Sequence, residues 1–270
     1  MTARVDLRSS GGKIARGYAD IKAALSTPFE VGSLELERYA DEDVARARRF
    51  WSERMKSEHR SVAVFGQLAV QLIEANAPLD MVTVAFRMAQ DELVHTEVCG
   101  RVLEALGAEA VIERDIGVEP MARHEGFSPL SRALRNVIYT TCLSEMVAVA
   151  RLADSLERSG DGVRPAIRAI LADEVMHGQF GFLALDALKG RIDDGVRQDL
   201  ESYLPLAFGV LERELVGFSR DPSPGAVELG VIESSRARDV FYGVIAEAIV
   251  PGLEARGLAA ARAWRERLRA

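Results

Sequence analysis

Asp91-Glu92-Leu93-Val94-His95 and Asp173-Glu174-Val175-Met176-His177 are the two stretches that decide the fold of this chain. Each reads Asp-Glu-x-x-His, and each lies inside a long pattern of helical periodicity. Residues three positions apart on an α-helix lie on one face, so each stretch presents a carboxylate and an imidazole side by side. The chain has only four histidines, and two of them stand at this spacing. Each stretch is therefore half of a candidate metal site, and the chain contains it twice.

Apolar residues recur at helical spacing along most of the chain, and no stretch alternates as a strand does. The fold class is therefore predicted to be all-α. Ser128-Pro129 is a typical helix start, and Gly107 is a typical helix end. Pro205 should kink its helix, residues 222–225 are expected to be a loop, and Pro251-Gly252 is expected to end a helix. These signals predict helices over residues 41–76, 79–106, 129–159, about 163–189, 194–218, 235–250 and 258–268, with a short one near residues 21–25.

A glutamate on the preceding helix accompanies each Asp-Glu-x-x-His. Glu58 precedes Glu92 by 34 residues, and Glu145 precedes Glu174 by 29 residues. Within each antiparallel helix pair the two acids are nearly equidistant from the turn, so they should lie level. Ionised carboxylates in an apolar stripe are costly unless a cation pairs with them. Four carboxylates and two neutral imidazoles balance the charge of two divalent cations, and mixed oxygen and nitrogen ligands suit iron or manganese.

Over residues 41–190 the chain resembles the ferritin-like di-iron carboxylate superfamily, and its doubled Asp-Glu-x-x-His resembles the bacterial multicomponent monooxygenases. The resemblance implies a ferritin-like four-helix bundle with additional N- and C-terminal helices. An irregular lead-in would occupy residues 1–40, the bundle residues 41–190, and further helices packed on it residues 191–270. The long connection after Gly107 could cross over the bundle.

The same resemblance implies which side chains form the catalytic metal centre. Glu92 and Glu174 would bridge the two metals, and Glu58 and Glu145 would be terminal ligands, each bound to one metal. Glu53 and Glu74 lie on the same helix as Glu58 and are alternatives to it. The complete ligand set expected is Glu58, Glu92, His95, Glu145, Glu174 and His177.

Three further residues are expected beside the metal ligands. In the monooxygenases that the chain resembles, the aspartate that opens the motif holds a ligating histidine. Asp91 and Asp173 each stand four residues before the histidine of their own stretch, so each can reach an imidazole N–H. Which aspartate serves which histidine stays open at this point. Thr141, one turn before Glu145, could face the oxygen site or the core.

The composition and charge of the chain limit the classes of partner that we expect. The net charge is −7 and the pI is about 5.3, so we expect neither nucleic acid nor an anionic membrane as a partner. No apolar run approaches the roughly 20 residues of a membrane span, and the first residues do not read as a secretory signal. Cys99 and Cys142 lie on apolar helix faces, which predicts free thiols and a cytoplasmic protein. Cys99 also stands where the small subunit of ribonucleotide reductase has its radical tyrosine, which argues against that role.

We therefore expect a non-haem di-iron oxidoreductase. It would use O2 to oxidise a small organic or carrier-bound substrate by hydroxylation, desaturation or N-oxygenation. The expected cofactor is two iron ions, with a manganese–iron or manganese pair as alternatives. The chain shows no flavin, haem or iron–sulfur motif, so a separate ferredoxin or reductase is implied; a homodimer is compatible with the sequence. The alternatives are a ferritin-like ferroxidase or iron-handling protein, a di-iron peroxidase, and a scaffold with a vestigial site.

Overall fold

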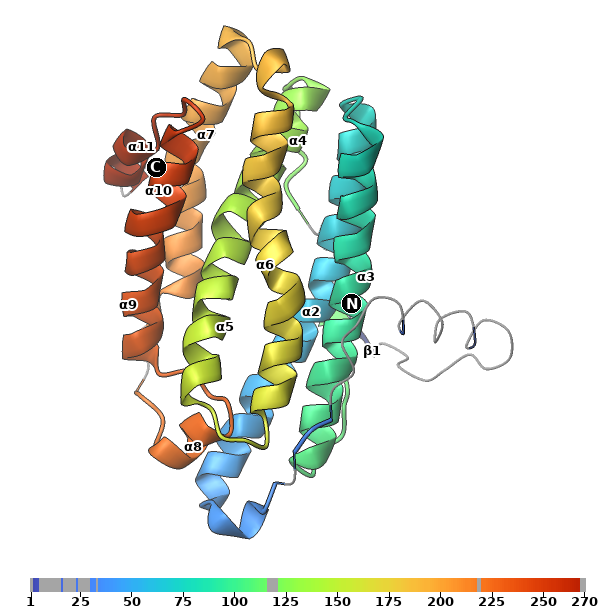
Figure 1. Cartoon of the computed structure of the whole chain (residues 1–270), viewed down its shortest axis with the longest axis vertical. Helices are drawn as coiled ribbons and strands as arrows, with labels where there is room; N and C mark the ends of the chain where they lie inside the picture. The colour runs from blue at the N-terminus through green and yellow to red at the C-terminus, as the bar shows by residue number, and fades with distance from the viewer. Residues whose placement is uncertain are drawn as a thin grey trace.

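The computed structural model describes residues 2–4, 16, 23, 30–32, 34–115, 121–217 and 220–267. Three long helical rods and a fourth in segments form the bundle, as the sequence predicts (Figure 1). They are α2 (Asp41–Glu74), α3 (Leu79–Ala105), α6 (Arg164–Ala187), and a rod made of α4 (Pro129–Val137), the π-helix η2 (Ile138–Glu145) and α5 (Met146–Arg158). The short helix expected near residues 21–25 lies almost entirely outside the described residues.

The predicted boundary signals act as expected. The Ser128 hydroxyl oxygen accepts a hydrogen bond from the Ser131 N–H at 3.1 Å, and Pro129 is the first residue of α4. Gly107 closes α3 with a φ of +72°, a conformation that glycine adopts without strain. The connection after it runs back along the bundle, because α3 ends at the opposite end from where α4 begins (Figure 1). The connection after Gly107 is therefore a crossover, as its length suggested.

A short strand pair was not expected. β1 (Thr2–Arg4) pairs antiparallel with β2 (Glu113–Asp115), which lies in the crossover connection. The pair has three residues a side, so it attaches the N-terminus to the bundle without altering the all-α class. The 3-10 helix η1 (Leu36–Arg38) precedes α2.

The C-terminal third of the chain adds helices to the bundle. α7 and α9 run along the side of the α4–η2–α5 rod (Figure 1). The elements are η3 (Lys189–Arg191), α7 (Asp194–Leu215), α8 (Pro224–Glu228), α9 (Ser234–Val244), the π-helix η4 (Ile245–Ile249), α10 (Val250–Glu254) and α11 (Ala260–Glu266). α7 contains Pro205 in its interior.

Two boundary predictions here were wrong. The expected loop over 222–225 contains the start of α8, because Ser223 caps it and Pro224 occupies the first turn, where its missing N–H costs nothing. Pro251 does not end its helix. It is the second residue after the π-helix η4, so its missing N–H falls where the hydrogen-bond register changes, and the helix continues to Glu254.

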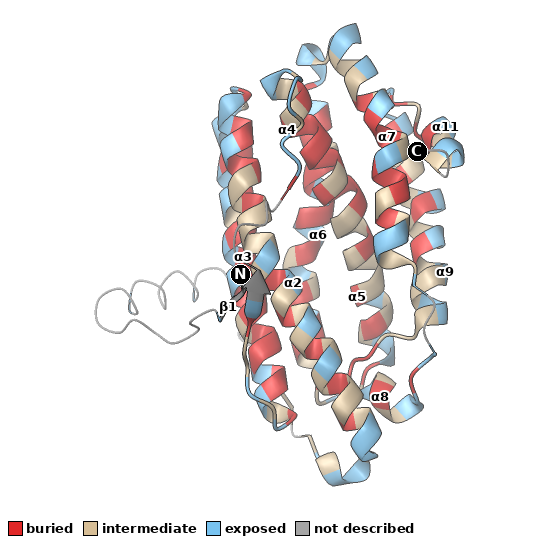
Figure 2. Cartoon of the chain, turned by 180° about the vertical axis from the view of Figure 1, so that it is seen from behind, coloured by how far each residue is buried: buried red, intermediate tan, exposed pale blue. Residues whose placement is uncertain are grey.

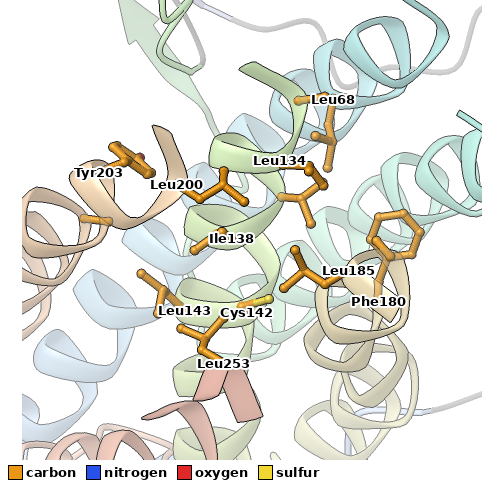
Figure 3. Packing of buried hydrophobic residues seen from close by; sticks show 14 of the residues in the cluster. Leu68, Leu134, Ile138, Cys142, Leu143, Phe180, Leu185, Leu200, Tyr203 and Leu253 are labelled. Atoms are coloured by element: carbon orange, nitrogen blue, oxygen red, sulfur yellow. The ribbon is translucent and has the colours of Figure 1, made fainter. Parts of the chain in front are cut away.

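Apolar clusters occupy both ends of the bundle and leave a polar layer between them. One cluster joins the C-terminal half of α2 and the N-terminal half of α3 to α4, α6 and the added helices; Figure 3 shows Leu68, Leu134 and Leu185 in it. The other is built around Trp51, Met55 and the C-terminal half of α3. The buried stripes of the helices are visible in Figure 2. The glutamates and histidines of the two motifs lie between these clusters.

Two further sequence expectations concern the cysteine thiols and membrane-spanning helices. Cys99 and Cys142 are both free and buried, as expected. Among the described residues, no helix combines the length and apolar character needed to cross a bilayer.

Candidate dimetal site

The structure brings the six expected ligands together midway along the bundle. They form two groups, and within each group one ligand atom from every residue lies within 4.8 Å of those from the others. Glu53 and Glu74 do not join them, because they pair with Lys56 and Arg132 on the outside of the bundle. One group is Glu58, Glu92, His95 and Glu174, and the other is Glu145, Glu174 and His177.

Glu92 and Glu174 each face both histidines. The Glu174 carboxylate has Oε1 at 3.4 Å from His95 Nδ1 and Oε2 at 3.0 Å from His177 Nδ1. The Glu92 carboxylate has Oε1 at 3.3 Å from His177 Nδ1 and Oε2 at 3.8 Å from His95 Nδ1. Each carboxylate thus directs one oxygen toward each half of the site. This is the arrangement expected of two bridging ligands, although ligation itself stays a prediction.

The buried polar atoms at the centre fit a pair of cations. Glu92 and His95 are each 1% exposed, Glu174 is 2% and His177 is 0%. Four of their atoms lack a hydrogen-bond partner: His95 Nδ1, His177 Nδ1, Glu92 Oε2 and Glu174 Oε2. Unpartnered buried polar atoms are rare in folded proteins because each forfeits its hydration. Two divalent metal ions would give every one of these lone pairs a positive partner.

The acid–base chemistry of the cluster leads to the same conclusion. Burial, followed by the proximity of Glu174, raises the pKa of Glu92 to about 7. Burial and the charges of Glu174 and Glu92 raise the pKa of Glu145 well above its usual range. Burial alone would lower the pKa of both histidines, but their carboxylate contacts raise it well above 6.5. The raised pKa values of Glu92, Glu145 and the two histidines favour bound protons in the metal-free cluster, and metal ions would compete with those protons.

The aspartates of the two motifs are crossed between helices. His177 Nε2 on α6 lies 3.4 Å from Asp91 Oδ2 on α3, and His95 Nε2 on α3 lies 3.4 Å from Asp173 Oδ2 on α6. Each aspartate thus serves the histidine of the other motif. An N–H at Nε2 donated to aspartate leaves the Nδ1 lone pair directed into the cluster. This answers the pairing question that the sequence left open.

Two arginines that the sequence reading missed hold this network. Arg87 Nε lies 2.7 Å from Asp91 Oδ1, and its Nη2 lies 3.9 Å from Asp173 Oδ1, so one guanidinium faces both aspartates. Arg54 Nε lies 2.9 Å from Glu58 Oε1. Each arginine stands four residues before its acid on the same helix. That spacing is a usable sequence signal for an ion pair.

Glu145 is the last residue of the π-helix η2. π-Helical turns are uncommon and occur often at functional sites, where the extra residue per turn redirects a side chain. Thr141 lies in the same segment and is fully buried. Its hydroxyl donates to the Val137 carbonyl at 2.6 Å, within its own helix, so a role for Thr141 at an oxygen site stays a prediction.

A cavity adjoins the cluster between α2, η2, α5 and the C-terminal end of α7. It has a volume of about 370 Å³, and Glu58, Glu92, Glu145 and Glu174 form part of its wall. A second cavity of about 510 Å³ adjoins it between α2, η2 and α7. The residues common to both walls are Arg60, Ser61, Ser144, Glu145 and Glu214. Glu145 therefore stands at the junction of two lobes of one hollow.

Comparison with known proteins supports the fold. No family model matches the chain, and no curated protein matches it. A similar solved structure is a protein with aldehyde deformylating oxidase activity from Synechococcus. The two chains are 18% identical, and the match covers 86% of this chain and 100% of the other, with a TM-score of 0.52. At this identity the likeness shows the fold alone, and it confirms the predicted all-α helical bundle.

Proposed function

We propose that this protein is a di-iron oxidoreductase that uses O2 to oxidise an organic substrate bound beside Glu145. The observation that carries the proposal is the hollow next to the cluster, because four of the candidate ligands form part of its wall. A protein that only oxidises or stores iron has no use for an organic pocket at this place. The activity stated for the similar Synechococcus protein also supports an oxidation of an organic compound.

Iron held by the six residues would supply the electrons that reduce O2. The chain's own residues prepare the site for this chemistry. Asp91 and Asp173 orient the two imidazoles, and Arg87 orients the two aspartates. Glu145, only partly buried at the junction of the lobes, can exchange a proton at its carboxylate with a neighbouring substrate.

The remaining parts of the proposal concern partners. Hydroxylation, desaturation and N-oxygenation are all compatible with an organic pocket beside a dimetal site. Each turnover that leaves the metals oxidised requires new electrons, and a ferredoxin or a reductase is the proposed source. Manganese at one or both positions is the alternative metal content, since the oxygen and nitrogen ligands accept it.

The first test is a metal count. The purified protein is loaded with excess Fe(II) in air, desalted, and its iron and protein are quantified. We expect about two irons per chain and no further uptake. Uptake of tens of irons per chain would replace this proposal with iron storage, and no iron or manganese would indicate a vestigial site. Rapid consumption of H2O2 by the loaded protein, without oxidation by O2, would favour the peroxidase alternative.

A further inference from the structure

We propose that the substrate is an organic anion with an apolar body, and that Arg151 on α5 binds its carboxylate. This inference rests on the proposed function and specifies its substrate class. Arg151 lines the cavity that opens onto the metal cluster. It lies on the same helical rod as Glu145, six residues further on, which is about 9 Å along the helix axis. The anionic group would thus be held apart from the metals and would not be a ligand to them.

Arg151 lacks a carboxylate partner. Its Nη2 donates to the Leu215 carbonyl at 2.7 Å, and its Nε is buried without a hydrogen-bond partner. Among the described residues, no acid lies within ion-pair distance of its guanidinium. Burial, with no compensating acid, lowers the pKa of Arg151. Arg151 is only partly exposed, and a cation partly withdrawn from water without a counter-charge is stabilised by a ligand that supplies that charge.

The charge of the cavity wall also favours an anion. Two divalent metal ions would balance the four glutamates of the cluster, and Glu53 is already paired with Lys56. The other charged residues of the wall are Arg54, Arg60 and Arg151 against Glu214. The wall therefore carries an excess of positive charge, which a carboxylate would reduce and a neutral substrate would not.

The adjoining lobe fits an apolar body. Its wall is formed largely by aliphatic and aromatic side chains, among them Val64, Met121, Tyr139, Tyr203, Leu206 and Val210. The two lobes meet at Glu145, so a molecule that spans both places its middle beside the metal cluster. Alkyl and aryl acids share this chemistry, and the binding experiment separates them.

A purely structural role for Arg151 is the competing explanation. Leu215 is the last residue of α7, so the guanidinium also satisfies a carbonyl at a helix C-terminus. A helix cap would stabilise the fold but would not discriminate between a carboxylate and an alcohol of the same length. Charge selectivity is therefore the property to measure.

The experiment compares the binding of acids and alcohols by calorimetry under anaerobic conditions. The Fe(II)-loaded protein, whose metal content is counted on the same sample, is titrated with decanoate, decan-1-ol, 4-phenylbutanoate and 4-phenylbutan-1-ol. Arg151→Gln, Arg151→Lys and Arg158→Gln are tested beside it. Arg158 is a matched control because it lies on the same helix, outside the cavity, and pairs with Glu233.

We expect at least one acid to bind about tenfold or more tightly than its alcohol, the difference that a charged hydrogen bond makes. Arg151→Gln should abolish the preference, Arg151→Lys should retain part of it, and Arg158→Gln should leave it unchanged. Equal binding of acid and alcohol, or a preference that survives Arg151→Gln, would overturn the inference; the second result would mean that the acid binds the metals directly. If the protein holds two irons but shows no preference for the acid, the inference about Arg151 fails and the proposed function stands. If the protein prefers the acid but holds no iron, the inference stands and the proposed function fails.

Discussion

The crossed aspartates make a prediction that separates the two metal positions. His95→Ala should leave the group of Glu145, Glu174 and His177 able to bind one metal. In that background Asp91→Asn removes the partner of His177, whereas Asp173→Asn removes a partner that the missing His95 no longer needs. Asp91→Asn should therefore weaken the remaining metal, and Asp173→Asn should leave its affinity within about twofold.

The structure sets the size of the effect. Loss of an aspartate behind a ligating histidine costs about 10–100-fold in metal affinity, or about 1.4–2.7 kcal/mol. The side chain of Asp91 is 6% exposed and that of Asp173 is 20% exposed. Water can therefore replace Asp173 more easily. We expect Asp91→Asn near the upper end of this range and, in the reciprocal His177→Ala background, Asp173→Asn near the lower end.

The assay is Co(II) binding in competition with a chelator of known affinity, at one pH and one ionic strength. Circular dichroism and thermal melts of each metal-free variant report whether it is folded. The reasoning fails if Asp173→Asn, and not Asp91→Asn, weakens the metal in the His95→Ala background. That result would mean that each aspartate serves the histidine of its own helix.

Three further predictions concern the bridge, the packing and the pH dependence. Glu174→Ala should lose both metals and Glu58→Ala only one, as counted by elemental analysis, because Glu174 belongs to both donor groups. Gly66→Ala should raise the free energy of unfolding by about 0.5–1 kcal/mol, since a Cβ there meets nothing within 4 Å. Gly181→Ala should lower it by about 1–3 kcal/mol, since a Cβ there would contact the Thr141 and Cys142 side chains and backbone; chemical denaturation measures both. Burial and then Arg135 lower the pKa of His124. The unfolded state therefore binds a proton more readily than the folded state, so protonation favours unfolding. In chemical denaturation the wild type should lose stability relative to His124→Gln as the pH falls below about 6.5, the usual pKa of histidine.

The positions of the candidate ligands could be predicted from the sequence because they follow from helical periodicity. Glu92 and His95 must share a face at a spacing of three, and so must Glu174 and His177. Equal distances from the turns then place Glu58 level with Glu92. None of these steps needs more than the rise and the period of an α-helix.

What could not be predicted depends on how the helices are rotated against each other. The sequence allows Asp91 to pair with either His95 or His177. Only the packing of α3 against α6 shows that its partner is His177. The π-helix that ends at Glu145 inserts an extra residue into a turn without a glycine or proline to mark it. The short helix at Pro224 was missed because the same residues that break helices also start them.

The added C-terminal helices are the part of the chain that would determine what the candidate dimetal site can do. The ligand set alone is common to proteins that store iron and to proteins that oxidise substrates, so it does not distinguish them. The difference lies in what covers Glu145. Here Leu206, Val210 and Glu214 of α7 line the hollow, and the carbonyl of Leu215 at the C-terminus of α7 holds Arg151 in its wall. The same helix therefore contributes to the apolar lobe and holds the cation at the other end of the hollow, so a substrate that spans both lobes would pass Glu145.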